Sequence, residues 1–197
     1  MKYWVIFACS ASDAARLAFI PKAGPKAYKY DKGIPLIDAC PAQEDMTMSY
    51  DSDYPDGIKL YDIAYCIDGV IVANKKVKEC LDNLGETNVE YLPVTLLNHK
   101  KDVSSTEYFI LNPLGGEDII DMDKSEYRMS ALNETQIARV KHLVVNQNGV
   151  SESAKFFRAK NKGDSYFVSD EVKIAFEEAG VSGYELFEAE GWDGLNV

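Results

Sequence analysis

Two stretches decide the fold: residues 166–187, YFVSDEVKIAFEEAGVSGYELF, and residues 71–92, IVANKKVKECLDNLGETNVEYL. They align without a gap at a constant offset of 95 residues, and four of the 22 aligned positions are identical. Each stretch opens with a strand pattern, continues as an amphipathic helix and closes with a second strand pattern. With their flanking residues the two units span 70–97 and 165–189. The pattern predicts one strand–helix–strand unit used twice, and two copies are too few for a solenoid.

Residue types predict where each helix begins and ends. In the first unit Asn74 is a suitable N-cap. The apolar residues that follow have the spacing of one helix face: Val77, Cys80, Leu81 and Leu84. Gly85 then suits the left-handed position that follows a helix. Ser169 and Gly180 occupy the same two positions in the second unit, so we expect the two helices to have the same limits.

Strand patterns dominate the remaining sequence. Residues 10–57 contain many Pro and Gly residues and predict an irregular N-terminal region, with a short helix over 13–19. Residues 58–67, IKLYDIAYCI, predict a strand. We therefore expect a single α+β domain over residues 1–197, with a mixed, mainly antiparallel sheet and two similar strand–helix–strand units.

Composition and charge limit the classes of function. Of the 197 residues, 46% are apolar and 27% are charged, as in an ordinary globular protein. No apolar run approaches the 18 residues or so that predict a membrane-spanning helix. The 21 basic and 32 acidic residues give a net charge of -11. Because phosphates and anionic lipids would be repelled, we expect no nucleic acid, no membrane and a basic protein partner.

The acidic residues are segregated along the chain. Residues 38–57, 107–126 and 166–197 together hold 20 of the 32 acids and 2 of the 21 bases, a net charge of -18. The rest of the chain has a net charge of +7. If the three segments meet in space, they form one strongly negative face, and otherwise they are separate solvated loops.

The sequence contains no motif for a metal, a cofactor or catalysis. Its four cysteines are Cys9, Cys40, Cys66 and Cys80, and they form no CxxC pair. This pattern is typical of a protein of the reducing cytoplasm without a zinc site. The two histidines, His99 and His142, have no metal-binding spacing. We expect no cofactor and no metal, although a Cys–His or Ser–His pair that meets only in space stays open.

One acidic run is the candidate partner-binding segment. Asp51, Asp53, Tyr54 and Asp56 lie in a stretch with Pro and Gly but without a basic residue. Loops on a rigid scaffold often carry recognition, Tyr supplies rigid contact area, and carboxylates steer a basic partner. The alternative interpretation is a solvated turn that leads into the strand expected at 58.

Three blocks of the chain resemble a bacterial immunity family. They are YFILN at 108–112 with DIIDMDKSEY at 118–127, a second block within 55–94, and a third within 167–187. Together they cover about residues 55–190 and resemble polymorphic-toxin immunity protein family forty-three, formerly a domain of unknown function. Some relatives carry doubled CxxC motifs that this chain lacks, so a metal site does not carry over.

The resemblance implies an α+β cytoplasmic protein that neutralises a secreted or contact-delivered toxin by binding it. We therefore expect a non-enzymatic immunity protein whose partner is a basic toxin domain. Two alternatives stay open at this point. One is a small hydrolase with a dispersed Cys, His and Asp site, and the other is an interaction module without a toxin.

Overall fold

The computed structural model describes residues 1–9 and 11–195, which form a mixture of strands and short helices. The strands are β1 (Tyr3–Ala8), β2 (Thr47–Ser49), β3 (Ile63–Ala64), β4 (Val72–Asn74), β5 (Val89–Leu97), β6 (Val103–Pro113), β7 (Glu126–Met129), β8 (Ile137–His142), β9 (Phe156–Ala159), β10 (Lys162–Ser169) and β11 (Tyr184–Glu188). The helices are the 3₁₀ helices η1 (Ala27–Lys32) and η2 (Ile37–Ala39) and the α-helices α1 (Lys75–Asn83) and α2 (Asp170–Glu178).

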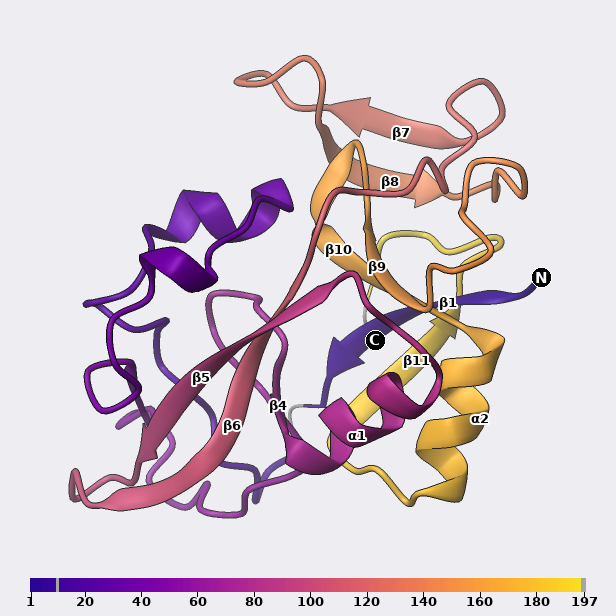
Figure 1. Cartoon of the computed structure of the whole chain (residues 1–197). Coiled ribbons are helices and arrows are strands. Elements are labelled where there is room, and N and C mark those ends of the chain that lie inside the picture. Colours follow the sequence, from indigo (N-terminus) through magenta and orange to yellow (C-terminus); the bar gives the residue numbers. More distant parts are fainter. Residues whose placement is uncertain (10, 196–197) are drawn as a thin grey trace.

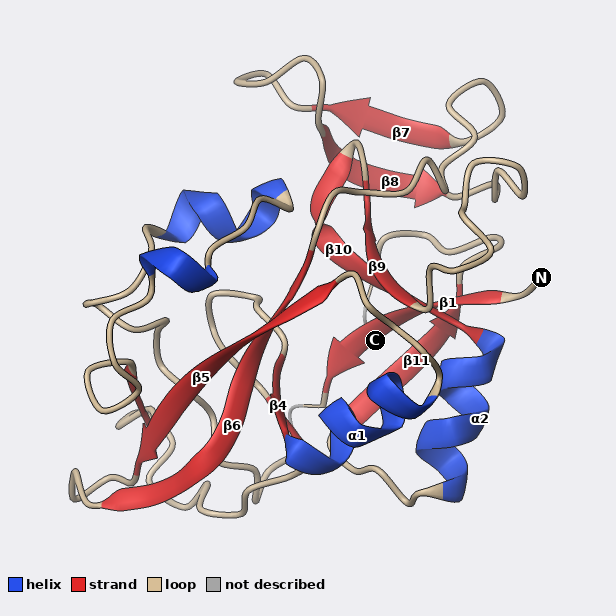
Figure 2. Cartoon of the chain, viewed as in Figure 1, coloured by secondary structure: helices blue, strands red, loops and turns tan. Residues whose placement is uncertain are grey.

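The strands form two larger sheets and one separate hairpin (Figure 2). The four-stranded sheet has the order β11-β1-β10-β9, and its neighbouring strands are antiparallel. The five-stranded sheet has the order β2-β5-β6-β4-β3, in which β2 and β5 are parallel and the other neighbours antiparallel. Strands β7 and β8 pair with each other. The predicted α+β class with a mixed, mainly antiparallel sheet is confirmed.

The two predicted strand–helix–strand units are present with the same helix limits. Helix α1 begins after Asn74 and α2 begins after Ser169. Gly85 and Gly180 follow the helices with φ of +73° and +60°, the left-handed conformation that glycine adopts most easily. The prediction from the 95-residue offset is confirmed for these boundaries.

Both units are split, because a third strand lies between the two strands of each unit. Strand β6 separates β4 from β5, and β1 separates β10 from β11. On β6, Ile110 lies opposite Val72 and Leu92. On β1, Val5 lies opposite the residues of the second unit that are equivalent to Val72 and Leu92, each 95 positions later in the chain. The units therefore share strand order, direction and register, although the central strand follows the unit in one case and precedes it in the other.

The elements stack in layers around three cores. Helices α1 and α2 lie side by side in Figure 1. The central core joins them to one face of each large sheet through residues that include Ile6, Ala73, Val77, Leu81, Leu111, Val172 and Phe176. The other face of the five-stranded sheet packs against the region 10–57. The other face of the four-stranded sheet packs against the β7–β8 hairpin and residues 119–120.

Two elements expected from the sequence are wrong. Residues 13–19 contain no helix, because Ala14 and Leu17 form isolated bridges to distant residues. Within 58–67 only β3 is a strand. The backbone of Leu17 accepts from the N–H of Ile67 and donates to the carbonyl of Tyr65, so the two segments bond to each other instead. Local propensity yields here to pairing between distant parts of the chain.

Candidate partner-binding surfaces

The candidate segment 51–56 forms an exposed loop that is held by one buried carboxylate. Asp51 is only 8% exposed. Its carboxylate accepts the N–H of Asp53 at 3.0 Å, and its own N–H donates to the carbonyl of Arg16 at 2.8 Å. Asp53 and Asp56 are exposed, and Tyr54 is 43% exposed. Asp51 therefore shapes the loop from inside, and the other three side chains are accessible to a partner.

A basic residue from outside the loop orders the aromatic ring. The guanidinium of Arg16 lies 3.8 Å from the ring centroid of Tyr54, a short cation–π distance. The run 51–56 itself contains no base, so the sequence pattern alone did not indicate this contact. Because the ring is already held in one position, a partner that covers it loses less conformational entropy.

The loop borders a groove of about 660 Å³, which we call the N-terminal groove. Residues 18–23 form one wall, and residues 45–53 form much of the other. Phe19 and Ile67 are exposed in the lining. Exposed apolar side chains beside charged ones are the composition of a protein interface. The structure thus places the sequence-predicted residues Asp51 and Asp53 in the wall of a hollow.

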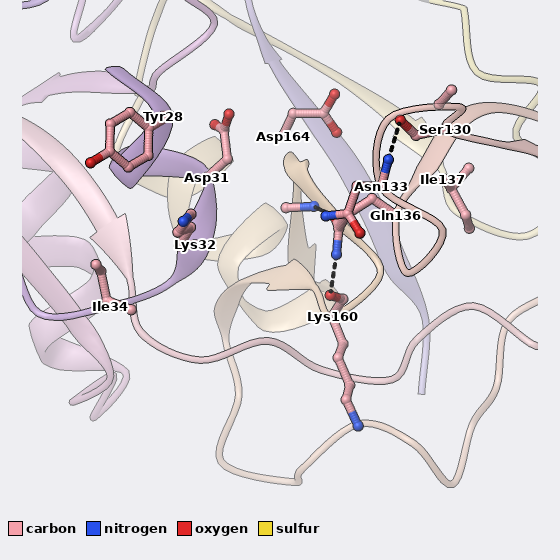
Figure 3. A pocket seen from close by; sticks show the side chains of 12 residues that line it. Tyr28, Asp31, Lys32, Ile34, Ser130, Asn133, Gln136, Ile137, Lys160 and Asp164 are labelled. Atoms are coloured by element: carbon pink, nitrogen blue, oxygen red, sulfur yellow. Dashed lines mark hydrogen bonds between the residues drawn. The ribbon is translucent and has the colours of Figure 1, made fainter. Parts of the chain in front are cut away.

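A second hollow, of about 640 Å³, lies between η1, the tip of the β7–β8 hairpin and the β9–β10 turn. We call it the central cleft. Its lining combines acids, bases and amides: Tyr28, Asp31, Lys32, Ile34, Ser130, Asn133, Gln136, Ile137, Ala138, Lys160, Gly163 and Asp164. Figure 3 shows these residues around the opening. No sequence motif marks this site, because its three walls come from segments separated by up to about 130 residues.

A buried arginine ties two walls of the central cleft together. Arg158 is 2% exposed and donates four hydrogen bonds. Its Nη1 reaches the carbonyls of Tyr30 in η1 at 2.6 Å and Gly163 in β10 at 2.8 Å. Its Nε and Nη2 reach the Pro113 carbonyl and Asn112 Oδ1. Charge-assisted bonds of this kind are strong and directional, so the position of η1 relative to β10 is well determined.

Two carboxylates face the cleft with different partners. Asp164 is bound by Lys162 Nζ at 2.8 and 3.1 Å. In the part of the chain that the structure describes, the exposed Asp31 carboxylate has no hydrogen bond or ion pair. The surrounding walls nevertheless raise the pKa of Asp31 by burial, and the like charge of Asp164 raises it further, whereas Arg158 and Lys162 lower it. Its exposure means that a ligand can still reach the carboxylate.

Three of the four thiols are shifted away from the reactive thiolate form. Burial raises the pKa of Cys66 to about 12 and also raises the pKa values of Cys40 and Cys80. A nucleophilic cysteine needs the opposite direction. His99 Nε2 is 3.1 Å from the Gly57 carbonyl.

Across residues 1–9 and 11–195, no group of three His, Cys, Asp or Glu side chains is placed to hold a metal ion. Within the same residues, no helix has the length and apolar character needed to cross a membrane.

The three acidic segments contact different parts of the fold. Segments 107–126 and 166–197 both reach residues 144–145, where Asp121 N–H donates to the Val144 carbonyl and Glu190 accepts from Val145 N–H. Segment 38–57 contains β2, which pairs with β5, and β5 in turn pairs with β6 at the start of segment 107–126. The first acidic segment is thus one strand away from the second, and the second meets the third at residues 144–145.

The α+β fold thus has two hollows, each lined by charged and exposed apolar side chains. The comparison with known families specifies the class further. A model described as "Immunity protein family (Imm11)" matches residues 16–191, so the chain belongs to this immunity protein family. The resemblance to an immunity family is confirmed, whereas the number forty-three is not. No curated protein matches the chain. The matched range includes both hollows.

Proposed function

We propose that this protein is an immunity protein that neutralises a cognate bacterial toxin domain by binding it directly in the cytoplasm. The observation that carries the proposal is the family match over residues 16–191, which leaves few residues outside the family region. In this role the protein needs an accessible recognition surface rather than a catalytic site. The raised pKa values of three of the four thiols are the opposite of what a nucleophilic cysteine needs.

The partner in this proposal is a basic toxin domain. Opposite net charges raise the rate of encounter, and this chain has a net charge of -11. Asp53, Tyr54 and Asp56 contact the partner beside the N-terminal groove, and Asp51 holds the loop in position. The groove supplies apolar contact area, because Phe19 is exposed in its wall.

The proposal is tested by expressing the toxin domain encoded beside the gene for this chain. Cells that express the toxin domain alone should stop growing, and co-expression of this chain should restore growth. The two purified proteins should form a stoichiometric complex whose association slows as salt rises, because exposed charges are screened beyond about 8–10 Å at physiological ionic strength. Continued growth arrest together with no complex would overturn the proposal.

The contact residues are tested by variants with a matched change of charge. The variant D53N/D56N should slow association several-fold, and Tyr54→Ala should speed dissociation. The control variant E178Q/E185Q also removes two exposed carboxylates, but from α2 and β11. If the loop variant and the control change the rates equally, the loop has no special part in binding.

A further inference from the structure

The central cleft has the properties of a receptor for one particular kind of side chain. We propose that it is the docking site for an arginine on a protruding loop of the protein partner, with the guanidinium bound by the Asp31 carboxylate. This inference rests on the proposed function, because the partner is the toxin domain. It concerns a different surface from the loop 51–56, which lies beside the N-terminal groove.

The cleft is preorganised, since its walls are bonded to one another. Beyond the bonds of Arg158, Gln136 at the tip of the hairpin donates to the Lys160 carbonyl at 3.2 Å and accepts the N–H of Gly163 at 3.3 Å. Gly163 also allows contact with η1, because a Cβ there would lie 2.0 Å from the Asp31 carbonyl. A hollow with fixed walls loses little entropy when a ligand enters.

A second glycine contact holds the end of η1. Gly33 has a φ of +60°, and a Cβ there would lie 2.0 Å from the carbonyl oxygen of Gly115. The N–H of Gly115 donates to the Gly33 carbonyl at 2.7 Å. The backbone that carries Asp31 is therefore fixed on both sides, by Arg158 through Tyr30 and by Gly115 through Gly33.

The Asp31 carboxylate has no bonded counter-charge in the described residues, and the lining lysines Lys32 and Lys160 form no ion pair with it. The two nearest buried cations are already engaged, since Arg158 donates to four oxygens and Lys162 binds Asp164. Lys32, the next residue, has its Nζ 5.0 Å from the ring centroid of Tyr28. Asp31 thus faces the like charge of Asp164 without a bonded counter-charge in the described residues. A guanidinium would supply that charge and donate two parallel hydrogen bonds to one carboxylate.

Exposed apolar side chains around the cleft indicate that the cation belongs to a protein loop. Tyr28 is 61% exposed, and Ile34, also in the lining, is exposed as well. Leu132 lies between the lining residues Ser130 and Asn133 and is 100% exposed. A free small cation would leave these side chains in water, whereas a loop that inserts an arginine also covers them. Tyr28 has an exposed ring on which a guanidinium can stack.

The cleft is tested by titrating the ¹⁵N-labelled full chain with N-acetyl-arginine amide. At millimolar concentrations the backbone amides of Lys32, Gly33 and Asp164 should shift and saturate. N-acetyl-citrulline amide has nearly the same shape without the charge and should cause no such shifts, and N-acetyl-lysine amide should bind more weakly. Asp31→Asn should abolish the arginine shifts, and Tyr28→Ala should weaken them.

The matched control is Asp38→Asn, which removes an exposed carboxylate in the neighbouring η2 and should leave the shifts intact. Thermal unfolding of each variant confirms that it is folded. Equal shifts from arginine and citrulline, shifts that persist in Asp31→Asn, or no shifts in the cleft would each overturn the inference.

Binding of the toxin domain separates this inference from the proposed function. Asp31→Asn should raise the dissociation rate of the complex about tenfold, while Asp38→Asn leaves it unchanged. If Asp31→Asn binds the toxin domain as tightly as the wild type, the cleft inference fails and the immunity function stands. If the wild type binds no toxin domain but arginine shifts the cleft amides as described, the immunity function fails and the guanidinium site stands.

Discussion

The two split strand–helix–strand units share their geometry but differ in how their helices begin. Both have a third strand between their two strands, and both end their helix with a left-handed glycine. Asn74 caps α1 with its side chain, whereas Ser169, at the same position before α2, does not. The repeated features are therefore register and packing, and the capping contacts are specific to each unit.

The first helix begins in a polar network. Asn74 Oδ1 accepts the N–H groups of Lys76 at 3.1 Å and Val77 at 3.4 Å, and its Nδ2 donates to Asp62 at 2.8 Å. Asp62 also accepts from the N–H and the hydroxyl of Ser182, both at 2.8 Å. Because Ser182 follows α2, the cap of the first unit also connects it to the second.

The second helix begins in a packed environment. Ser169 is fully buried, and its Oγ has no hydrogen-bond partner among the described residues. The acids of the first turn favour the helix N-terminus instead. Asp170 accepts from the indole N–H of Trp4 at 3.0 Å, and Glu171 forms an ion pair with Lys155 at 2.7 Å. The start of α2 is thus defined by its packing and by these two acids rather than by a side-chain cap.

The largest expected effect tests the core that both units share. Leu81 and Phe176 occupy equivalent positions, 95 residues apart, and both are fully buried in the central core. Leu81→Ala should lower the free energy of unfolding by about 2–5 kcal/mol, and Phe176→Ala by about 3–5 kcal/mol. Urea denaturation followed by both circular dichroism and tryptophan fluorescence measures this. Transitions that separate into two steps would show that the units unfold independently.

The second prediction concerns the difference between the two helix starts. Asn74→Ala removes a cap and the bond to Asp62, so it should lower stability by about 1–2 kcal/mol. Ser169→Ala removes a buried hydroxyl without a partner in the described residues, so it should change stability little or raise it. Chemical denaturation of both variants measures the contrast. Equal losses in the two would mean that Ser169 caps its helix after all.

The local features of the units could be predicted from the sequence, and the contacts between distant segments could not. Apolar spacing and glycine stops located both helices, because these signals lie within a few residues of each helix. The insertion of β6 and β1 between the unit strands depends on pairing with distant segments. Position 169 has a residue type that favours capping, but burial and packing determine what its hydroxyl contacts.

The candidate surfaces were likewise predictable where the signal is local and not where distant segments meet. The acidic loop 51–56 was identified from composition, although burial of Asp51 was not. The central cleft was missed because it forms from three segments that carry no shared motif. One local signal was present: β9 (Phe156–Ala159) is otherwise apolar and contains one base, Arg158, and a charged residue in a buried strand demands partners.

The third prediction tests the left-handed glycine that follows the helix in both units. A Cβ at Gly85 or Gly180 would meet no atom within 4 Å, so a substitution there meets only the conformational penalty of positive φ. Gly85→Ala and Gly180→Ala should each lower stability by about 1 kcal/mol. Thermal denaturation at matched protein concentrations measures the pair. A loss confined to one variant would show that the two helix ends are not equivalent.

The smallest effects should come from two aspartates whose pKa values shift in opposite directions. At Asp62 burial acts to raise the pKa, but hydrogen bonds from Ser182, Asn74 and Lys76 outweigh it and the pKa is lowered. At Asp31 burial and then Asp164 raise the pKa. Ionisation of Asp62 is therefore stabilising above its unfolded pKa, about 3.9, whereas ionisation of Asp31 is destabilising once the pH exceeds its raised folded value.

The two Asn variants should consequently respond to pH in different ways. Asp62→Asn should be less stable than the wild type at pH 7, and the deficit should begin to shrink only below the unfolded pKa, about 3.9, as the pH falls toward the lowered folded pKa of Asp62. Asp31→Asn should be slightly more stable than the wild type at pH 7, and this gain should shrink as the pH falls toward 4. Melting temperatures from pH 7 down to about pH 2 measure both differences. A gain for Asp31→Asn at neutral pH together with loss of arginine binding would show that the carboxylate is kept for recognition at some expense of stability, whereas a neutral-pH loss would mean that Asp31 stabilises the fold through its charge.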